Sequence, residues 1–412
     1  MLFRGCIYLS KKLEQSLKKI DKLFEKMKYN NISTNDDRNV SYGTYKTYAD
    51  QVKAVLRQAH KEFGIERIED LTIDMFNEML DERIARYHNG KFSESSNINS
   101  KISAISGFII GFEKTNVFRK TKDVAAFAKF NKDVMKEMRA YVKECEVVRR
   151  GSDSTVLRAN KQQALSVIKD IQKDGYDKEN RRKAADIALL TFMTGARVSS
   201  ALKIRVEDIN FDEKYVLMKN AKGGLDYAVQ MNSDSIKVLE RLVDGLGPKQ
   251  RLFEFKRKDG SYMSIEGARK VVSRYVEQSG QASEQTVKKV HKDQHGVEKI
   301  VEAKSTFTHH SLRKAFAHET MVRYINEIKT KDDIKMELEK LTKVDPKVKG
   351  KFDRLVRRGN KYRNKKTLPL KDISLRAAII FFTSVQLGHY RNDIVVSHYC
   401  SYKEALSTAK KI

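Results

Sequence analysis

Apolar residues recur at intervals of three and four over long stretches of this 412-residue chain, and only three prolines interrupt it. Such spacing places the apolar side chains on one face of an α-helix. Because proline breaks helices more strongly than any other residue, its scarcity favours a chain that is mostly helical. One such run near the N-terminus consists of Leu13, Leu17, Ile20, Leu23, Phe24 and Met27.

The first part of the chain is expected to hold a helix, a helical domain and a linker. Residues 1–40 are predicted to form an N-terminal amphipathic helix followed by a polar linker. Residues 41–147 are predicted to form a small all-helical domain, because helical spacing continues through four further segments. Residues 148–160 combine charge, glycine and serine without periodicity, which is typical of an interdomain linker.

Residues 161–412 are predicted to form a second domain, with helices around a small antiparallel sheet. Alternating apolar residues on both sides of Gly223 and Gly224 predict a β-hairpin, because glycine adopts positive φ readily. We expect a polar loop over 280–305 and a basic insertion with helical pieces over about 328–371. The expected fold class is therefore mainly α with a small antiparallel β-sheet.

The chain contains 82 Lys and Arg against 54 Asp and Glu, which gives a net charge of +28. A folded chain this basic is expected to bind a polyanion, most often nucleic acid. The longest apolar run, 377–382, is far too short to span a bilayer, and residues 1–10 show no signal peptide. Three widely separated cysteines exclude a cysteine-rich zinc site. We therefore expect a cytoplasmic, nucleoid-associated protein without a membrane partner.

Four separated motifs contain residues suited to phosphate chemistry, although each is a weak signal alone. Arg197 follows a Gly-Ala break at the end of an apolar helix, and Lys222 lies at the tip of the predicted hairpin. His310 and Arg313 are three residues apart, so they share a face at the start of a helix. A guanidinium beside an imidazole makes a compact phosphate site. The fourth motif is a Gly-His break at 388–389 with tyrosines after it.

In this order along the chain, the motifs resemble those of the tyrosine recombinase family, also called the phage integrase family. The resemblance covers about 160–412, and the helical segment before it resembles the family's core-binding domain. The family's motifs read like TGxR, a GKG-like turn with a lysine, HxLRxxxA and LGH. The matching stretches are 194–197, 221–224, 310–317 and 387–389.

The resemblance implies a catalytic domain that cleaves and rejoins DNA through a 3′-phosphotyrosyl intermediate and a Holliday junction. It implies double-stranded DNA as the partner of a homotetramer on two sites, with accessory DNA-bending proteins as possible further partners. Neither metal, ATP nor another cofactor is expected. The implied catalytic residues are the nucleophile Tyr399, the phosphate-binding Arg197, Arg313 and His389, the acid Lys222 and the proton acceptor His310.

The chain departs from the family pattern in three places. Ser200 stands where the family commonly has an acid, and the insertion 328–371 lengthens the interval before His389. Tyr399 follows His389 by ten residues, whereas the family tyrosine usually follows by about nine. Tyr402 is therefore the alternative nucleophile, since it lies almost one helical turn beyond Tyr399.

The leading functional hypothesis is a site-specific recombinase that integrates or excises a mobile element. A relaxing enzyme similar to the type IB topoisomerases is one alternative, and a DNA-binding regulator that does not cut is another. The LGH motif and the core-binding-like domain favour recombination, and filled catalytic positions disfavour the regulator. RNA binding without chemistry is supported by the net charge alone.

Overall fold

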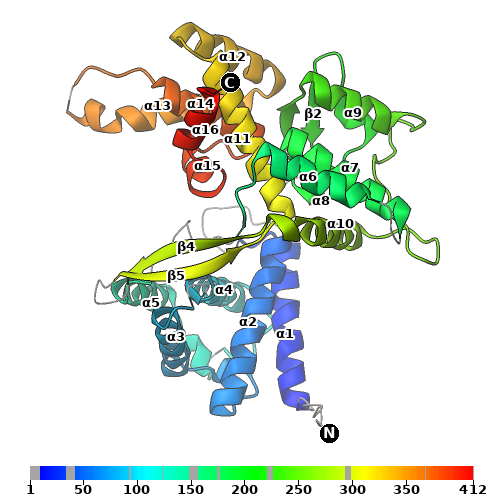
Figure 1. The fold of residues 1–412 in the computed structure, drawn as a ribbon. Helices are drawn as coiled ribbons and strands as arrows, with labels where there is room; N and C mark the ends of the chain where they lie inside the picture. Colours follow the sequence, from blue (N-terminus) through cyan, green and yellow to red (C-terminus); the bar gives the residue numbers. More distant parts are fainter. Residues whose placement is uncertain are drawn as a thin grey trace. The chain divides into compact units, whose positions relative to one another are not determined.

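The computed structural model describes residues 10–33, 42–91, 94–122, 124–147, 156–173, 177–219, 226–292, 298–366 and 368–411. The chain divides into two compact units. Unit 1 comprises Met1–Asp153 and Lys289–Val301, and unit 2 comprises Ser154–Lys288 and Glu302–Ile412. Helices predominate in both units, and the strands form small sheets (Figure 1), which confirms the predicted fold class. No helix within the described ranges is long and apolar enough to cross a membrane.

Unit 1 is helical throughout most of its described residues. Polar side chains begin several of its helices: Ser10 accepts a hydrogen bond from the backbone N–H of Leu13, and Thr72 accepts one from that of Met75. Such caps satisfy N–H groups that have no partner inside the helix. The helices are α1 (Lys11–Tyr29), α2 (Tyr42–Phe63), α3 (Ile73–His88), α4 (Glu94–Lys114) and α5 (Lys132–Glu144), with 3-10 turns at Ile68–Asp70 and Ala126–Lys129.

Helix α1 packs against α2 and α4 in the core of unit 1. Gly111 on α4 faces α1 so closely that an added Cβ would lie 2.4 Å from Leu23 Cδ2 and 2.5 Å from Met27 Sδ. A side chain at this position would push the two helices apart. The helix that we assigned to the separate segment 1–40 thus shares one core with the helices that follow it.

Unit 2 contains a three-stranded antiparallel sheet of β1 (Ile209–Asn210), β2 (Tyr215–Met218) and β3 (Tyr227–Gln230), in that order. Helix α11 is largely buried and contacts α6, α7, α14 and α16. The helices of the unit are α6 (Lys161–Gln172), α7 (Lys178–Thr194), α8 (Val198–Ala201), α9 (Ser233–Val243), α10 (Ile265–Gly280), α11 (His309–Glu327), α12 (Lys331–Val344), α13 (Lys347–Lys365), α14 (Leu375–Gln386), α15 (Asn392–His398) and α16 (Tyr402–Ala409).

The prediction of a polar loop over 280–305 was wrong. After a 3-10 turn at Gln281–Ser283, β4 (Gln285–Lys292) and β5 (Glu298–Ser305) form a two-stranded sheet (Figure 1). The strand sequences, QTVKKVHK and EKIVEAKS, mix charged residues with few apolar ones. Backbone hydrogen bonds hold such a ribbon together, so it lacks the strong apolar alternation by which a half-buried strand is recognised.

The basic segment 328–371 folds as two helices, α12 and α13, that belong to the core of unit 2. Phe352 on α13 stacks on Phe382 of α14, with ring centroids 5.9 Å apart, and meets Phe381 edge-on at 5.3 Å. Tyr324 of α11 donates a hydrogen bond to Glu337 of α12, with an O–O distance of 2.9 Å. The segment is therefore anchored to the helices around it.

Replacing Gly111 by alanine should lower the free energy of unfolding by about 1–3 kcal/mol, because the methyl group overpacks the contact between α1 and α4. Gly350 on α13 has no atom within 4 Å of an added Cβ, so it supplies a control. Gly350→Ala should stabilise the protein by up to about 1 kcal/mol, since alanine favours the helix. Thermal denaturation followed by circular dichroism measures both, and equal effects would contradict the tight α1–α4 contact.

Candidate active site

Arg313 lies near the start of α11 and is only 1% exposed. Its guanidinium donates Nη1 to the carbonyl of Gly195 and Nη2 to the carbonyl of Leu387, the latter at 3.4 Å. Gly195 ends α7 and Leu387 ends α14. Helix C-termini present carbonyl groups without intrahelical partners and carry partial negative charge. The carbonyl groups at these two helix ends thus replace the hydrogen bonds to water that the buried guanidinium has lost.

Glycine is needed where α7 and α14 end. Gly195 has φ 64° and Gly388 has φ 67°, in the left-handed region. A Cβ at Gly195 would lie 2.4 Å from the ring of Phe316, and one at Gly388 would lie 2.7 Å from the ring of Tyr227. Both glycines therefore allow a sharp turn and a close contact with a ring. These turns place Arg197 and His389, which follow the glycines, near Arg313.

Tyr399 ends α15 and is 3% exposed. Its hydroxyl accepts a hydrogen bond from Arg313 Nη2 at 3.2 Å and lies 2.9 Å from His389 Nε2. The ring centroid lies 5.0 Å from that of His310 and 5.5 Å from Arg313 Cζ. The phenol is thus surrounded by one guanidinium and two imidazoles.

Arg197 completes this group from the turn between α7 and α8. Its Nη2 lies 3.4 Å from His389 Nε2. Burial, and then the charge of Arg313, lower the pKa of Arg197 from its usual value. Five of the predicted catalytic residues therefore meet in unit 2, while Lys222 lies outside the described residues. The five are Arg197, His310, Arg313, His389 and Tyr399.

The other tyrosines of the C-terminal segment contact different groups. Tyr402 begins α16, and its ring lies against Arg376, with Cζ 5.2 Å from the centroid. Tyr390 donates its hydroxyl to Asp345, in the turn between α12 and α13. Tyr399 is the tyrosine whose hydroxyl contacts Arg313.

His309 and His310 are adjacent at the start of α11. Burial, and then the positive charge of Arg313, lower the pKa of each to about 3. His309 Nε2 lies 3.1 Å from Thr191 Oγ1 on α7. Both imidazoles are therefore neutral at pH 7, and His310 is in the form that can accept a proton.

Tyr227 lies beside the site, although it was not among the predicted catalytic residues. It begins β3, packs its ring on Gly388 and is 2% exposed. Its hydroxyl is buried without a hydrogen-bond partner among the described residues. A tyrosine in a strand is ordinary core material, so only the contact with the turn at Gly388 reveals its position.

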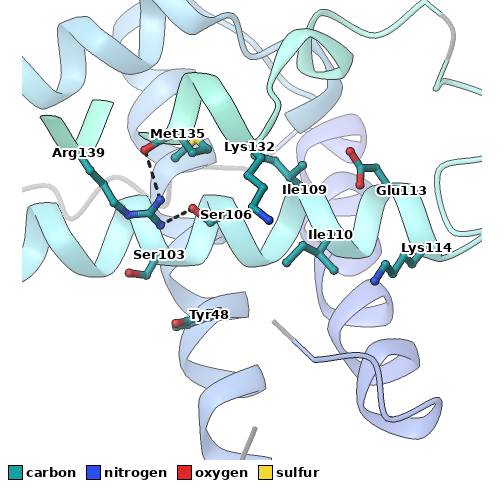
Figure 2. A pocket seen from close by; sticks show the side chains of 10 residues that line it. All are labelled: Tyr48, Ser103, Ser106, Ile109, Ile110, Glu113, Lys114, Lys132, Met135 and Arg139. Atoms are coloured by element: carbon teal, nitrogen blue, oxygen red, sulfur yellow. Dashed lines mark hydrogen bonds between the residues drawn. The ribbon is translucent and has the colours of Figure 1, made fainter. Parts of the chain in front are cut away.

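Unit 1 has a pocket of about 240 Å³ between α2, α4 and α5. Figure 2 shows Arg139 of α5 pointing across it, where Nη2 donates to Ser106 Oγ at 2.7 Å and Nη1 to the carbonyl of Met135 at 3.3 Å. Lys114 and Lys132 also line it, whereas the predicted catalytic residues do not. Within the described part of the chain, no group of three or more His, Cys, Asp or Glu could hold a metal ion.

Stability should fall as the pH is lowered from about 6.5 toward 3. An unfolded histidine binds a proton near pH 6.5, whereas folded His309 and His310 bind one only at about pH 3. The unfolded state therefore holds more protons within this window, and acid favours unfolding. His309→Gln removes one of these groups and should flatten the dependence.

Thermal denaturation at about pH 7.5 and about pH 5.5 measures this effect. His60→Gln, which alters a histidine on α2 of unit 1, is the matched control. A loss of stability in acid that both variants share with the unmodified protein would contradict the buried neutral state of His309.

One family of known proteins matches a segment of the chain that lies mostly in unit 2. Residues 157–327, from just before α6 to the end of α11, match the sequence profile of the phage integrase family. This segment includes Arg197, Lys222, His310 and Arg313, whereas His389 and Tyr399 lie beyond it. No curated protein matches the chain.

Three solved structures illustrate the similarity. A lambda integrase dimer bound to a COC′ core site is 17% identical, with a TM-score of 0.42 over 79% of this chain and 90% of that one. The Tn1549 transposon integrase in complex with transposon right end DNA is 13% identical, with a TM-score of 0.44 over 95% and 98%. XerA recombinase is 13% identical, with a TM-score of 0.34 over 97% and 98%. Residues 157–327 are thus similar to the phage integrase family, and they hold four of the six predicted catalytic residues.

Proposed function

We propose that this protein is a site-specific DNA recombinase that integrates or excises a mobile element through a covalent 3′-phosphotyrosyl intermediate. One observation carries the proposal: the Tyr399 hydroxyl lies between Arg313 and His389. Arg313 belongs to the segment matched by the family profile, and the other two residues lie beyond it. A hydroxyl nucleophile beside a cation and a proton acceptor is the arrangement that transesterification requires.

In the proposed cleavage step, the phenolic oxygen of Tyr399 attacks the scissile phosphorus. The bond from this oxygen to phosphorus forms, and the bond from phosphorus to the 5′-oxygen breaks. His389 Nε2, 2.9 Å from the hydroxyl, is in position to accept the phenolic proton. The family resemblance assigns this role to His310, whose ring lies beside the tyrosine ring. Lys222 would donate a proton to the departing 5′-oxygen.

Arg197 and Arg313 would bind the non-bridging phosphate oxygens and stabilise the charge that develops at phosphorus. In the structure, the Tyr399 hydroxyl already accepts a hydrogen bond from Arg313, and the tyrosine is almost fully buried. Entry of a phosphate therefore requires a local shift of the segment around α15. The phosphotyrosyl ester retains the energy of the broken bond, so a 5′-hydroxyl can rejoin the strand without ATP.

The proposed partner is double-stranded DNA at specific recombination sites, bound by a homotetramer that exchanges strands through a Holliday junction. The net charge of +28 supports this partner, because contacts to phosphates dominate the affinity of proteins for DNA. Neither a metal ion nor a nucleotide takes part in the proposed reaction, since the guanidiniums supply the charge stabilisation. Accessory DNA-bending proteins are proposed as additional partners.

Nicked duplexes tiling the DNA beside the protein's own gene should trap a protein–DNA adduct that resists SDS, in the presence of a chelator. Tyr399→Phe should abolish the adduct, because it removes the attacking oxygen, and Tyr402→Phe should leave it unchanged. Peptide mapping locates the attachment. Transfer of the trapped strand to a second duplex distinguishes recombination from relaxation. Binding without any adduct would contradict the proposal and favour a regulator that does not cut.

Arg197→Lys should slow cleavage by about 10²–10³-fold, the usual effect of losing one donor to a transition-state oxyanion. Lysine keeps the charge but lacks the planar fork that binds two phosphate oxygens. Single-turnover cleavage of a nicked duplex measures the rate. Arg182→Lys, an exposed arginine on α7, is the matched control. An unchanged rate in the Arg197 variant would show that Arg197 does not bind the reacting phosphate.

A further inference from the structure

Helix α13 presents a continuous row of exposed cations. Their spacing of four, three, four and three residues keeps them on one face of the helix. With a rise of 1.5 Å per residue, a row that spans fourteen steps is about 21 Å long. The row consists of Lys347, Lys351, Arg354, Arg358 and Lys361.

The rest of α13 is anchored to unit 2. Val348 and Phe352 are buried, and Phe352 stacks on Phe382. The Asn360 side chain donates to the carbonyl of Lys371 and accepts from its backbone N–H, each at 2.9 Å. The cations therefore stand on a helix that is held in place, rather than on a loose basic tail.

The neighbouring helix α12 shows how exposed charges are usually arranged. Each of its four lysines lies 2.5 to 3.9 Å from a carboxylate oxygen: Lys331, Lys335, Lys340 and Lys343. None of the five cations of the α13 row forms an ion pair with a residue that the structure describes. Like charges three and four residues apart destabilise a helix. Such a row is typical of a surface that binds a polyanion.

Hydrogen bonds connect the insertion, which consists of α12 and α13, to the elements that carry the proposed catalytic residues. Tyr390, next to His389, donates to Asp345 between α12 and α13. Tyr324 of α11 hydrogen-bonds to Glu337 of α12 and accepts from Gln386 of α14 at 3.2 Å. Helix α11 carries Arg313, and α14 leads to His389. A phosphate held on α13 would thus have a defined position relative to the proposed cleavage site.

Gly350 lies beside the row, between Lys347 and Lys351. No atom of the protein lies within 4 Å of a Cβ built there. Glycine inside a helix costs roughly 1 kcal/mol relative to alanine, and packing within the protein does not require it here. The missing side chain lets another backbone approach α13 closely.

We propose that the row on α13 is an additional DNA-binding surface, which contacts duplex phosphates outside the cleavage site. The inference rests on the proposed function, since it takes double-stranded DNA as the polyanion. Each strand of B-DNA carries one phosphate per roughly 3.4 Å of helix axis, so a row of about 21 Å matches the length of about six phosphates on one strand. These contacts add affinity and fix the register of the protein without reading sequence. Helix α13 lies outside residues 157–327, so the family match does not account for it.

The salt dependence of DNA binding tests the proposal. Fluorescence anisotropy would measure binding of the full chain to a random-sequence duplex of about 40 base pairs, as the salt concentration is varied. The test variant combines Lys351→Gln, Arg354→Gln, Arg358→Gln and Lys361→Gln. The control combines Lys331→Gln, Lys335→Gln, Lys340→Gln and Lys343→Gln, which removes the same number of charges from α12.

The slope of log K against log salt should decrease in magnitude by about 3–4 in the α13 variant, because each lost phosphate contact contributes about 0.9. It should change by less than about 1 in the α12 control. Circular dichroism melts check that both variants fold. The single variants Arg354→Gln and Arg358→Gln, each expected to change the slope by about 0.9, serve if the combined variant unfolds.

An unchanged slope in the α13 variants would overturn the inference. An equal change of slope in both combined variants would overturn it too, because net charge alone would then explain the salt dependence. An effect confined to duplex RNA would overturn it as well. Trapping at Tyr399 separates this inference from the proposed function. If the unmodified protein forms the adduct and the α13 variant keeps the original slope, only the role of α13 is wrong. If no adduct forms although the duplex is bound, the proposed function itself fails.

Discussion

The buried guanidinium of Arg313 is the interaction on which the rest of unit 2 depends. Removing an ion from water costs several kcal/mol unless other groups replace the lost solvation. Here the carbonyls that end α7 and α14 accept its hydrogen bonds, so both helices must end beside the start of α11. Gly195 and Gly388 make these ends possible, because each adopts positive φ against an aromatic ring.

The convergence of helix ends also explains why the reactive groups meet. Arg197 follows Gly195 by two residues, and His389 follows Gly388 directly. The turns that supply carbonyl groups to Arg313 therefore also place Arg197 and His389 near Arg313. Tyr399 reaches the same place from α15, and its hydroxyl joins Arg313 to His389. Burial beside these cations keeps His309 and His310 neutral, since a further positive charge would be costly. The result is a cationic site that favours an anionic ligand.

The insertion extends this scaffold without changing it. In the sequence, α12 and α13 lie between the segment matched by the family profile and the turns that carry His389 and Tyr399. Buried contacts of Phe352 with Phe381 and Phe382 hold them in place. The insertion can therefore lengthen the chain by two helices while the proposed catalytic residues still meet, because its attachment points lie on α11 and α14.

Much of this architecture could be predicted from the order of motifs and from local periodicity. Helical spacing is a short-range property, so it placed His310 and Arg313 on one face and indicated the helices of both units. The sequence left Tyr402 as an alternative to Tyr399 for the nucleophile, because the spacing of the two residues does not reveal where α15 ends. Strands β4 and β5 were missed because their sequences lack strong apolar alternation. An amphipathic pattern marks the buried face of a helix but does not identify the helix that packs against it. Tertiary packing therefore decided which helix ends converge on Arg313 and which tyrosine hydroxyl contacts it.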